Sequence, residues 1–142
     1  MKSTLVAAAV AAVVFSQATP AAKPAPAKAA IAAAVADTHR PAKDTEQDTV
    51  RRPADLLAFS KVKAGDTVLD VWPGGGYWSR LFSPIVGAKG KVYAYVPAEI
   101  AEFKSDPVAL AKAIGKEPAY GNVEGISDPL AEPPPANMLN TF

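Results

Sequence analysis

The sequence predicts an α/β domain built on a doubly wound parallel sheet. Short apolar runs typical of buried strands alternate with helical stretches between residues 67 and 126, in the order strand–helix–strand–helix–strand. A cluster of glycines joins the first strand to the helix that follows it, as in ligand-binding α/β sheets. Because 49% of the residues are hydrophobic and 20% are charged, the chain has enough apolar side chains to form a core.

Six elements carry this prediction. The expected helices span 53–60, 77–86 and 107–114, and the expected strands span 67–71, 91–96 and 122–126. Residues 44–51 suit one or two polar helical turns, and Pro53 suits the first position of the helix after them. The turn signal Ala64-Gly65-Asp66 separates that helix from the first strand.

Proline and glycine define the boundaries of the remaining elements. Pro84 is expected to end or kink the helix that begins at Tyr77. The glycines at 87 and 90 mark a turn before the second strand. Asp106 is a suitable N-cap for the last helix, which Gly115 closes.

Length, charge and composition restrict the function of this domain. At 142 residues the chain forms one domain at most. Its 15 basic and 14 acidic side chains give a formal charge of +1, so no global field attracts nucleic acid or an anionic membrane. The chain has no cysteine and a single histidine, His39. A disulfide framework, a thiolate metal site and a cysteine nucleophile are therefore excluded, and we predict no metal site.

The first 18 residues have the features of a signal peptide in the required order. Lys2 provides a positive end, residues 5–15 are an uninterrupted apolar run, and Ser16 and Ala18 are the small residues of a cleavage site. The run is shorter than the about 20 residues of a membrane span, and a buried alanine-rich helix is the alternative. We expect residues 1–18 to be removed, the protein to be periplasmic or secreted from a bacterial cell, and no stable membrane anchor to remain.

Residues 19–36 are predicted to be a linker rich in Ala, Pro and Lys. Pro20, Pro24 and Pro26 interrupt any helix there, and the segment has nothing large to bury. Residues 29–35 are compatible either with a short helix or with the end of the linker. The folded domain is then expected to span residues 37–142.

The residues with chemical potential lie where the first strand meets the glycines. Asp70 is near the carboxyl end of that strand, where open α/β sheets bind ligands, and Gly74, Gly75 and Gly76 follow before the helix. Glycines at this position let a nucleotide-like ligand approach the backbone, and a helix N-terminus supplies N–H donors. The structural alternatives are a plain turn for the glycines and a helix cap for Asp70.

Three kinds of nucleotide site use glycine-rich loops of this type. A phosphate-binding P-loop requires Gly-Lys-Ser/Thr, which residues 76–78 lack. A dinucleotide fingerprint would place Ser79 at its last glycine, and the acid that it requires after the next strand appears late, as Glu99. The spacing of the third kind of site is present. An acid is followed by a glycine four residues later and by another two residues after that, Asp70…Gly74-x-Gly76.

Residues 68–79 resemble motif I of the class I S-adenosylmethionine-dependent methyltransferases. The likeness covers residues 35–130 and extends to a secreted bacterial branch of predicted methyltransferases. The residues that follow the pattern of this branch are Arg40, Asp44, Asp48, Arg51-Arg52-Pro53 and segments 56–59, 62–66, 73–77 and 90–94. The resemblance implies a partial Rossmann-like sheet with the first three to four strands of that fold, preceded by a signal peptide and a helical N-terminal region.

The resemblance also implies S-adenosylmethionine as the cofactor. In the family pattern, Asp70 and the backbone of residues 74–76 would line its methionine and ribose portions. Glu99 would replace the acid that binds the ribose hydroxyls, Asp128 would lie near the adenine, and Trp72 stands where the motif has its first glycine. From the residues alone, Glu99 and Asp128 are better explained as solvated loop acids. The resemblance assigns no catalytic residue.

By the same resemblance the chain reaches only the start of a fourth strand, so we expect a cofactor-binding half without an acceptor half. The sheet edge that later strands would cover is expected to be open and to promote self-association. Two functions remain open. One is a methyltransferase, or its cofactor-binding half, that acts by direct displacement at the sulfonium methyl. The other is a non-catalytic secreted α/β binding module, or an inactive fragment of a longer methyltransferase.

Overall fold

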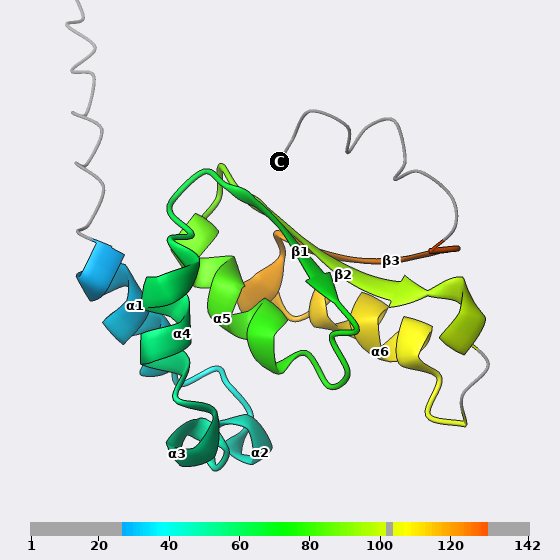
Figure 1. Ribbon diagram of the computed structural model, residues 1–142, viewed down its shortest axis with the longest axis horizontal. Helices are drawn as coiled ribbons and strands as arrows, with labels where there is room; N and C mark the ends of the chain where they lie inside the picture. The colour runs from blue at the N-terminus through cyan, green and yellow to red at the C-terminus, as the bar shows by residue number, and fades with distance from the viewer. Residues whose placement is uncertain (1–26, 102–103, 131–142) are drawn as a thin grey trace, which may run out of the picture.

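The computed structural model describes residues 27–101 and 104–130, which form a parallel sheet covered by helices (Figure 1). The strands, in the order β1-β2-β3, are β1 (Thr67–Val71), β2 (Lys91–Pro97) and β3 (Val123–Asp128). The connecting helices are α5 (Tyr77–Val86) and α6 (Pro107–Ile114), with short 3₁₀ turns η1 (Ala98–Ile100) and η2 (Pro118–Tyr120). The helices before the sheet are α1 (Ala27–Val35), α2 (Ala42–Thr45), α3 (Asp48–Arg51) and α4 (Pro53–Ser60).

The α/β class and the parallel sheet are confirmed. The predicted helices over 53–60, 77–86 and 107–114 and the first strand have the predicted bounds, while β2 and β3 each run beyond their predicted ends. Pro84 lies inside α5, two residues before the helix ends at Val86, so the helix continues past the proline although this residue supplies no backbone N–H. Figure 1 shows α5 and α6 on the same face of the sheet, because crossovers of one hand between strands added in one direction share a face. The doubly wound arrangement, with helices on both faces, stays a prediction.

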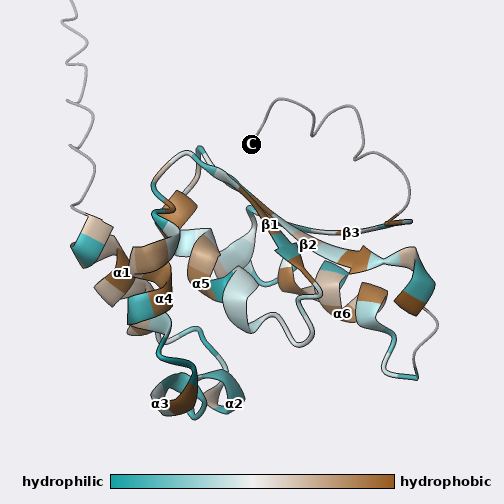
Figure 2. Cartoon of the chain, in the orientation of Figure 1, coloured by the Kyte–Doolittle hydropathy of each residue, from teal (hydrophilic) through white to brown (hydrophobic). Residues whose placement is uncertain are grey.

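Folded structure begins earlier than the sequence predicted. Residues 27–35 form α1, which agrees with the helical alternative for residues 29–35 and lies before the predicted start of the domain at residue 37. Ile31 and Ala34 of α1 are buried with Leu57 of α4 and Leu81 of α5. Alanine has the highest intrinsic helix propensity, and burial of one face against other helices adds the stability that a short isolated helix lacks. Figure 2 shows mostly hydrophobic residues in α1 and α4, whereas α2 and α3 are largely hydrophilic.

Several predictions concern residues outside the described part of the chain. They are the signal peptide over 1–18, residues 19–26 of the linker and the final segment 131–142 of the predicted domain. Among the described helices, none has the length and apolar character needed to cross a bilayer.

Buried side chains form two clusters that meet along α5. One cluster packs β2, β3 and α6 together through residues such as Val92, Val96 and Ile114. The other joins α1, α4 and α5 and includes Leu57 and Leu81. Val62 and Phe82 pack against both clusters, so sheet and N-terminal helices share one continuous interior.

A buried arginine fastens the helical N-terminal region to α5. Arg40, 5% exposed, donates two hydrogen bonds to the carboxylate of Asp48, at 2.6 and 2.9 Å, and one to Val35 O at 2.7 Å. The Tyr77 hydroxyl donates to the same carboxylate at 2.7 Å. Burial, and then the neighbouring Asp48, raise the pKa of Tyr77 to about 12, so the phenol stays protonated and able to donate. Arg40 and Asp48, two of the residues that follow the pattern of the secreted branch, thus stabilise the fold.

The backbone of α6 lies directly against β3 at Gly125. A Cβ on Gly125 would overlap the backbone atoms of Ala111 and Lys112, and backbone cannot move aside as a flexible side chain can. The absence of a side chain at this position therefore allows the helix to pack closely on the sheet.

Gly125→Ala should lower the free energy of unfolding by about 1–3 kcal/mol, the usual range for overpacking a tight interior. Gly121→Ala is the matched control, because nothing lies within 4 Å of its Cβ position and its φ of −63° suits alanine. Chemical denaturation of the two variants and the unchanged protein measures the effect. Equal unfolding midpoints for both variants would show that α6 does not depend on this contact.

Candidate functional site

A tight turn carries the chain from β1 into α5. Trp72, Gly74 and Gly76 all have left-handed backbone angles, with φ of +62°, +54° and +87°. The N–H of Gly76 donates to Pro73 O at 2.8 Å, and the N–H of Trp72 donates to Tyr95 O of β2 at 2.9 Å. The turn is therefore tied to the sheet at its first residue and closed on itself at its last.

The glycines of this turn have different reasons for lacking a side chain. A Cβ on Gly74 would meet nothing within 4 Å, so the space beside Gly74 is open. A Cβ on Gly76 would instead collide with the Ile114 side chain of α6 and come within 3.0 Å of an Arg80 nitrogen. On Gly75 it would lie 3.6 Å from Lys43 Nζ. Close ligand approach to the backbone is thus possible at Gly74, whereas Gly76 is required for packing.

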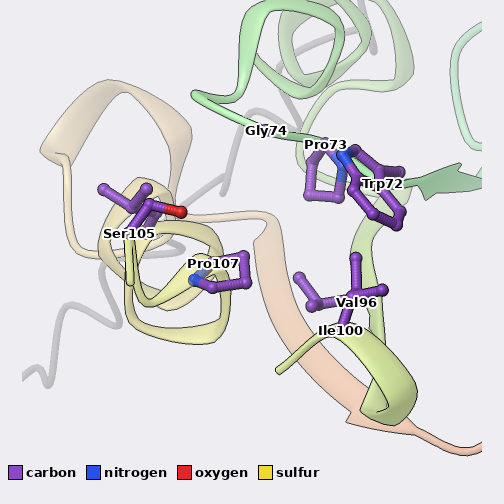
Figure 3. A pocket seen from close by; sticks show the side chains of 8 residues that line it. Trp72, Pro73, Gly74, Val96, Ile100, Ser105 and Pro107 are labelled. Atoms are coloured by element: carbon purple, nitrogen blue, oxygen red, sulfur yellow. The ribbon is translucent and has the colours of Figure 1, made fainter. Parts of the chain in front are cut away.

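The open space beside Gly74 belongs to a cavity of about 210 Å³ at the carboxyl edge of the sheet. Figure 3 shows Trp72 and Pro73 on one side, Val96 and Ile100 below them, and Ser105 and Pro107 on the facing side. Leu110 of α6 completes the lining. The cavity presents carbon over most of its wall, with the Ser105 hydroxyl and the backbone as polar groups, and this composition suits a planar, weakly polar ring.

Asp70 serves the start of α5 rather than the cavity. Its side chain is 8% exposed and accepts a hydrogen bond from Ser79 Oγ at 2.6 Å. Burial raises the pKa of Asp70, and hydrogen bonds from the Ser79 side chain and backbone offset part of that rise. The carboxylate therefore supplies an acceptor to the third residue of the helix, where backbone N–H groups lack partners. This placement matches the helix-cap alternative.

Glu99 and Asp128 lie near each other but outside the wall of the cavity. Glu99 Oε1 accepts from Leu130 N at 3.0 Å, and the Tyr95 hydroxyl donates to Asp128 O at 2.6 Å. Burial raises the pKa of Tyr95, and the negative charges of Glu99 and Asp128 raise it further. Of the predicted site residues, the structure thus gathers these two around Tyr95, places Gly74 at the cavity and leaves Asp70 beneath α5.

Sequence reasoning missed the wall that α6 contributes. Ser105, Pro107 and Leu110 face Gly74 across the cavity. The signal available was the N-cap at Asp106, which accepts from Ala109 N at 3.0 Å and so starts α6 at the same edge of the sheet as the glycine turn.

No group of three or more His, Asp or Glu side chains suited to a metal ion occurs among the residues that the structure describes.

Comparison with known proteins finds one solved structure with a similar chain. No family model and no curated protein matches. The solved structure is a SAM-dependent methyltransferase from Aquifex aeolicus, with 30% sequence identity and a TM-score of 0.48. The match covers 67% of this chain and 50% of that one, so this chain spans about half the length of the protein that it matches.

The raised pKa of Asp70 has a measurable consequence for stability. The native state holds this proton more tightly than the unfolded chain does, so ionisation of Asp70 opposes folding as the pH rises from about 4 through its native pKa. Asp70→Asn keeps an acceptor for Ser79. The stability of the unchanged protein relative to Asp70→Asn should therefore fall with rising pH and then level off, as measured by urea unfolding at a series of pH values.

Asp66 provides the opposite case. A hydrogen bond from Lys63 lowers the pKa of Asp66, so its contribution is lost as the pH falls. The stability of the unchanged protein relative to Asp66→Asn should rise with pH over the acidic range. If stability relative to Asp70→Asn and stability relative to Asp66→Asn both rose with pH, the assigned environment of Asp70 would be contradicted.

Proposed function

We propose that this chain binds S-adenosylmethionine and is the cofactor-binding part of a methyltransferase. The observation that carries the proposal is Gly74, which has a left-handed backbone and open space in place of a side chain. It lies beside an apolar cavity at the carboxyl edge of a parallel sheet. The spacing Asp70…Gly74-x-Gly76, which resembles motif I of the class I enzymes, supports the same cofactor.

The residues present fit part of this cofactor. The wall of Trp72, Val96, Ile100 and Leu110 offers apolar contact to an adenine ring, and the backbone at Gly74 can approach a ligand without a Cβ between them. At about 210 Å³ the cavity is smaller than the roughly 300–1,000 Å³ typical of pockets that enclose a whole small molecule. We infer that the rest of the ligand extends over the turn toward α5.

The contribution of this chain is binding and orientation. When bound, the cofactor supplies an activated methyl group on its sulfonium centre. The start of α5 at Tyr77, directly after the turn, places the positive end of a helix dipole where an anionic group of the ligand is favoured. The indole of Trp72 and the α6 residues hold the ring from two sides and exclude water from it.

A non-catalytic binding module is the second candidate, and one observation favours it. Among the described residues, no side chain that titrates near neutral pH lines the cavity. The site therefore offers contact and shape but no general acid or base. A module of this kind would bind the same class of ligand without transferring a group.

We further propose that the outer edge of β1 pairs with a second copy of the chain. Within the described residues β1 pairs with β2 alone, so its other edge carries unpaired backbone groups. Leu69 and Val71 are 37% and 52% exposed, and with Leu56 and Trp78 they line a groove of about 450 Å³. Two identical edges related by a twofold axis satisfy each other and cover these apolar groups.

Calorimetric titration with S-adenosylmethionine and S-adenosylhomocysteine tests the binding site. The unchanged protein should bind both, and Leu110→Trp should weaken binding by about tenfold or more by filling the cavity. Ala113→Trp, at an exposed position of the same helix, is the control and should leave the affinity unchanged. Absence of binding by the unchanged protein at millimolar ligand would reject the cofactor. Equal affinities for the two variants would place the site elsewhere.

Sedimentation equilibrium over a range of concentrations tests the edge. The average mass should rise with concentration for the unchanged protein and stay monomeric for Val71→Lys, since a charge on an open edge opposes pairing. Val50→Lys, at an 85% exposed position of α3, should associate like the unchanged protein. A monomer at all concentrations would contradict the proposed pairing.

A further inference from the structure

Arg80 of α5 is a buried cation that holds three separate segments of the chain. Its side chain is among the buried charged groups, with the residue only 6% exposed. It donates from Nη1 to Gly75 O at 2.6 Å and to Asp44 Oδ2 at 3.2 Å. It also donates from Nη2 and Nε to the two carboxylate oxygens of Glu117, at 2.6 and 3.2 Å. The glycine turn, α2 and the loop after α6 thus converge on one guanidinium.

Apolar packing alone does not account for a charge at this position. Removing ions from water costs several kcal/mol each, and well-packed hydrophobic residues often replace a buried ion pair without loss of stability. Burial lowers the pKa of Arg80, but the hydrogen bond and charge of Glu117 and the charge of Asp44 raise it to a net increase, so the group stays charged. What an apolar side chain cannot provide is a donor to the carbonyl of Gly75.

The Gly75–Gly76 peptide is held from both sides. Its carbonyl accepts from Arg80 Nη1, and its N–H donates to Pro73 O. A fixed peptide plane restricts the backbone angles of Gly75 and Gly76, and the closed turn restricts Gly74 between them and Pro73. Glycine is the residue with the most backbone freedom to lose, so a run of three glycines has most to gain from such an anchor. The lack of a Cβ on Gly76 is also what leaves room for the guanidinium.

We propose that Arg80 is a positioning residue for ligand binding: it holds the turn over residues 73–76 in the form that opens Gly74 to the cavity. The inference rests on the proposed function, because its readout is the affinity for that cofactor. Preorganisation of a binding loop raises affinity by removing the entropy that would be lost on binding.

Arg40 provides a matched control within the same chain. It is as buried as Arg80, at 5% exposed, and its guanidinium makes the same two-pronged contact with a carboxylate, that of Asp48. Its third hydrogen bond goes to Val35 O, away from the glycine turn. Loss of Arg40 and loss of Arg80 are therefore both expected to destabilise the fold, and only loss of Arg80 frees the Gly75 carbonyl.

The test compares Arg80→Met and Arg80→Lys with Arg40→Met and Arg40→Lys. Urea unfolding measures stability, and calorimetry under conditions where each variant is folded measures affinity for S-adenosylhomocysteine. Arg80→Met should lower the affinity by about tenfold or more, the loss of one hydrogen bond from a charged donor. Arg80→Lys, which keeps a cation beside Asp44 and Gly75, should recover part of that loss. Both Arg40 variants should stay within about twofold of the unchanged protein.

A second measurement needs no ligand and covers the case in which Arg80→Met fails to fold. Glu117→Gln removes the negative charge beside the Arg80 guanidinium and preserves the size of the side chain at position 117. Hydrogen exchange of the Gly76 amide, relative to amides in the centre of β2, should be faster in Glu117→Gln and in Arg80→Lys than in the Arg40→Lys control.

The outcomes separate the two hypotheses. If the unchanged protein binds no S-adenosylhomocysteine, the proposed function fails and the role of Arg80 in binding falls with it. If the unchanged protein binds but the Arg80 and Arg40 variants lose affinity equally, or the Gly76 amide keeps its protection, the inference fails while the proposed function stands. Selective loss in the Arg80 variants, together with faster Gly76 exchange, supports both.

Discussion

Burial of β2 is the constraint on which the rest of this structure depends. β2 lies between β1 and β3, and every residue from Val92 to Pro97 is buried. A strand in that position has no polar face, so its alternate side chains must be covered from both sides and its register cannot shift without exposing them. The pairing of Val71 with Tyr95 and of Val96 with Ser127 brings the carboxyl ends of all three strands to one edge. The cavity, η1 and the glycine turn are located there as a result.

The second organising feature is α5, which collects the buried polar groups of the domain. In the first turn of α5, Ser79 donates a hydrogen bond to Asp70 and Tyr77 donates one to Asp48. Arg80 forms ion pairs with Asp44 and Glu117. A 10-residue helix that packs the sheet on one side and α1 on the other has little surface left for water. Polar side chains at its buried positions therefore have partners inside the protein, and these partners come from segments far apart in sequence. The N-terminal helices are held to the sheet in this way.

Because the buried polar groups gather around α5, the cavity has an apolar wall while charged side chains lie outside that wall. The cavity wall consists of apolar side chains and glycine backbone, with Ser105 as its hydroxyl. Charged side chains do not line the cavity, and Arg80, Asp44 and Glu117 instead hold the turn and α5. Such a division suits the proposed role of binding and orienting a ligand, since affinity comes from shape and from restricted motion more than from charge. Asp70, Glu99 and Asp128 do not line this cavity, and their predicted contacts with a cofactor stay predictions.

The sequence by itself determined the order and type of α4, β1, α5, β2, α6 and β3 and the position of the glycine turn. Those features follow from local causes: β-branched runs, proline at helix starts and glycine where the backbone needs a positive φ. Only the tertiary structure decided which face of each helix and strand is buried and which residues it contacts. Asp70 turned out to cap α5, Gly76 to make room for Ile114 and Arg80, and α1 to join the core, because each outcome depends on a partner from a distant segment. Successive residues of a strand point to opposite faces of the sheet. A residue at the carboxyl edge can therefore point away from the cavity.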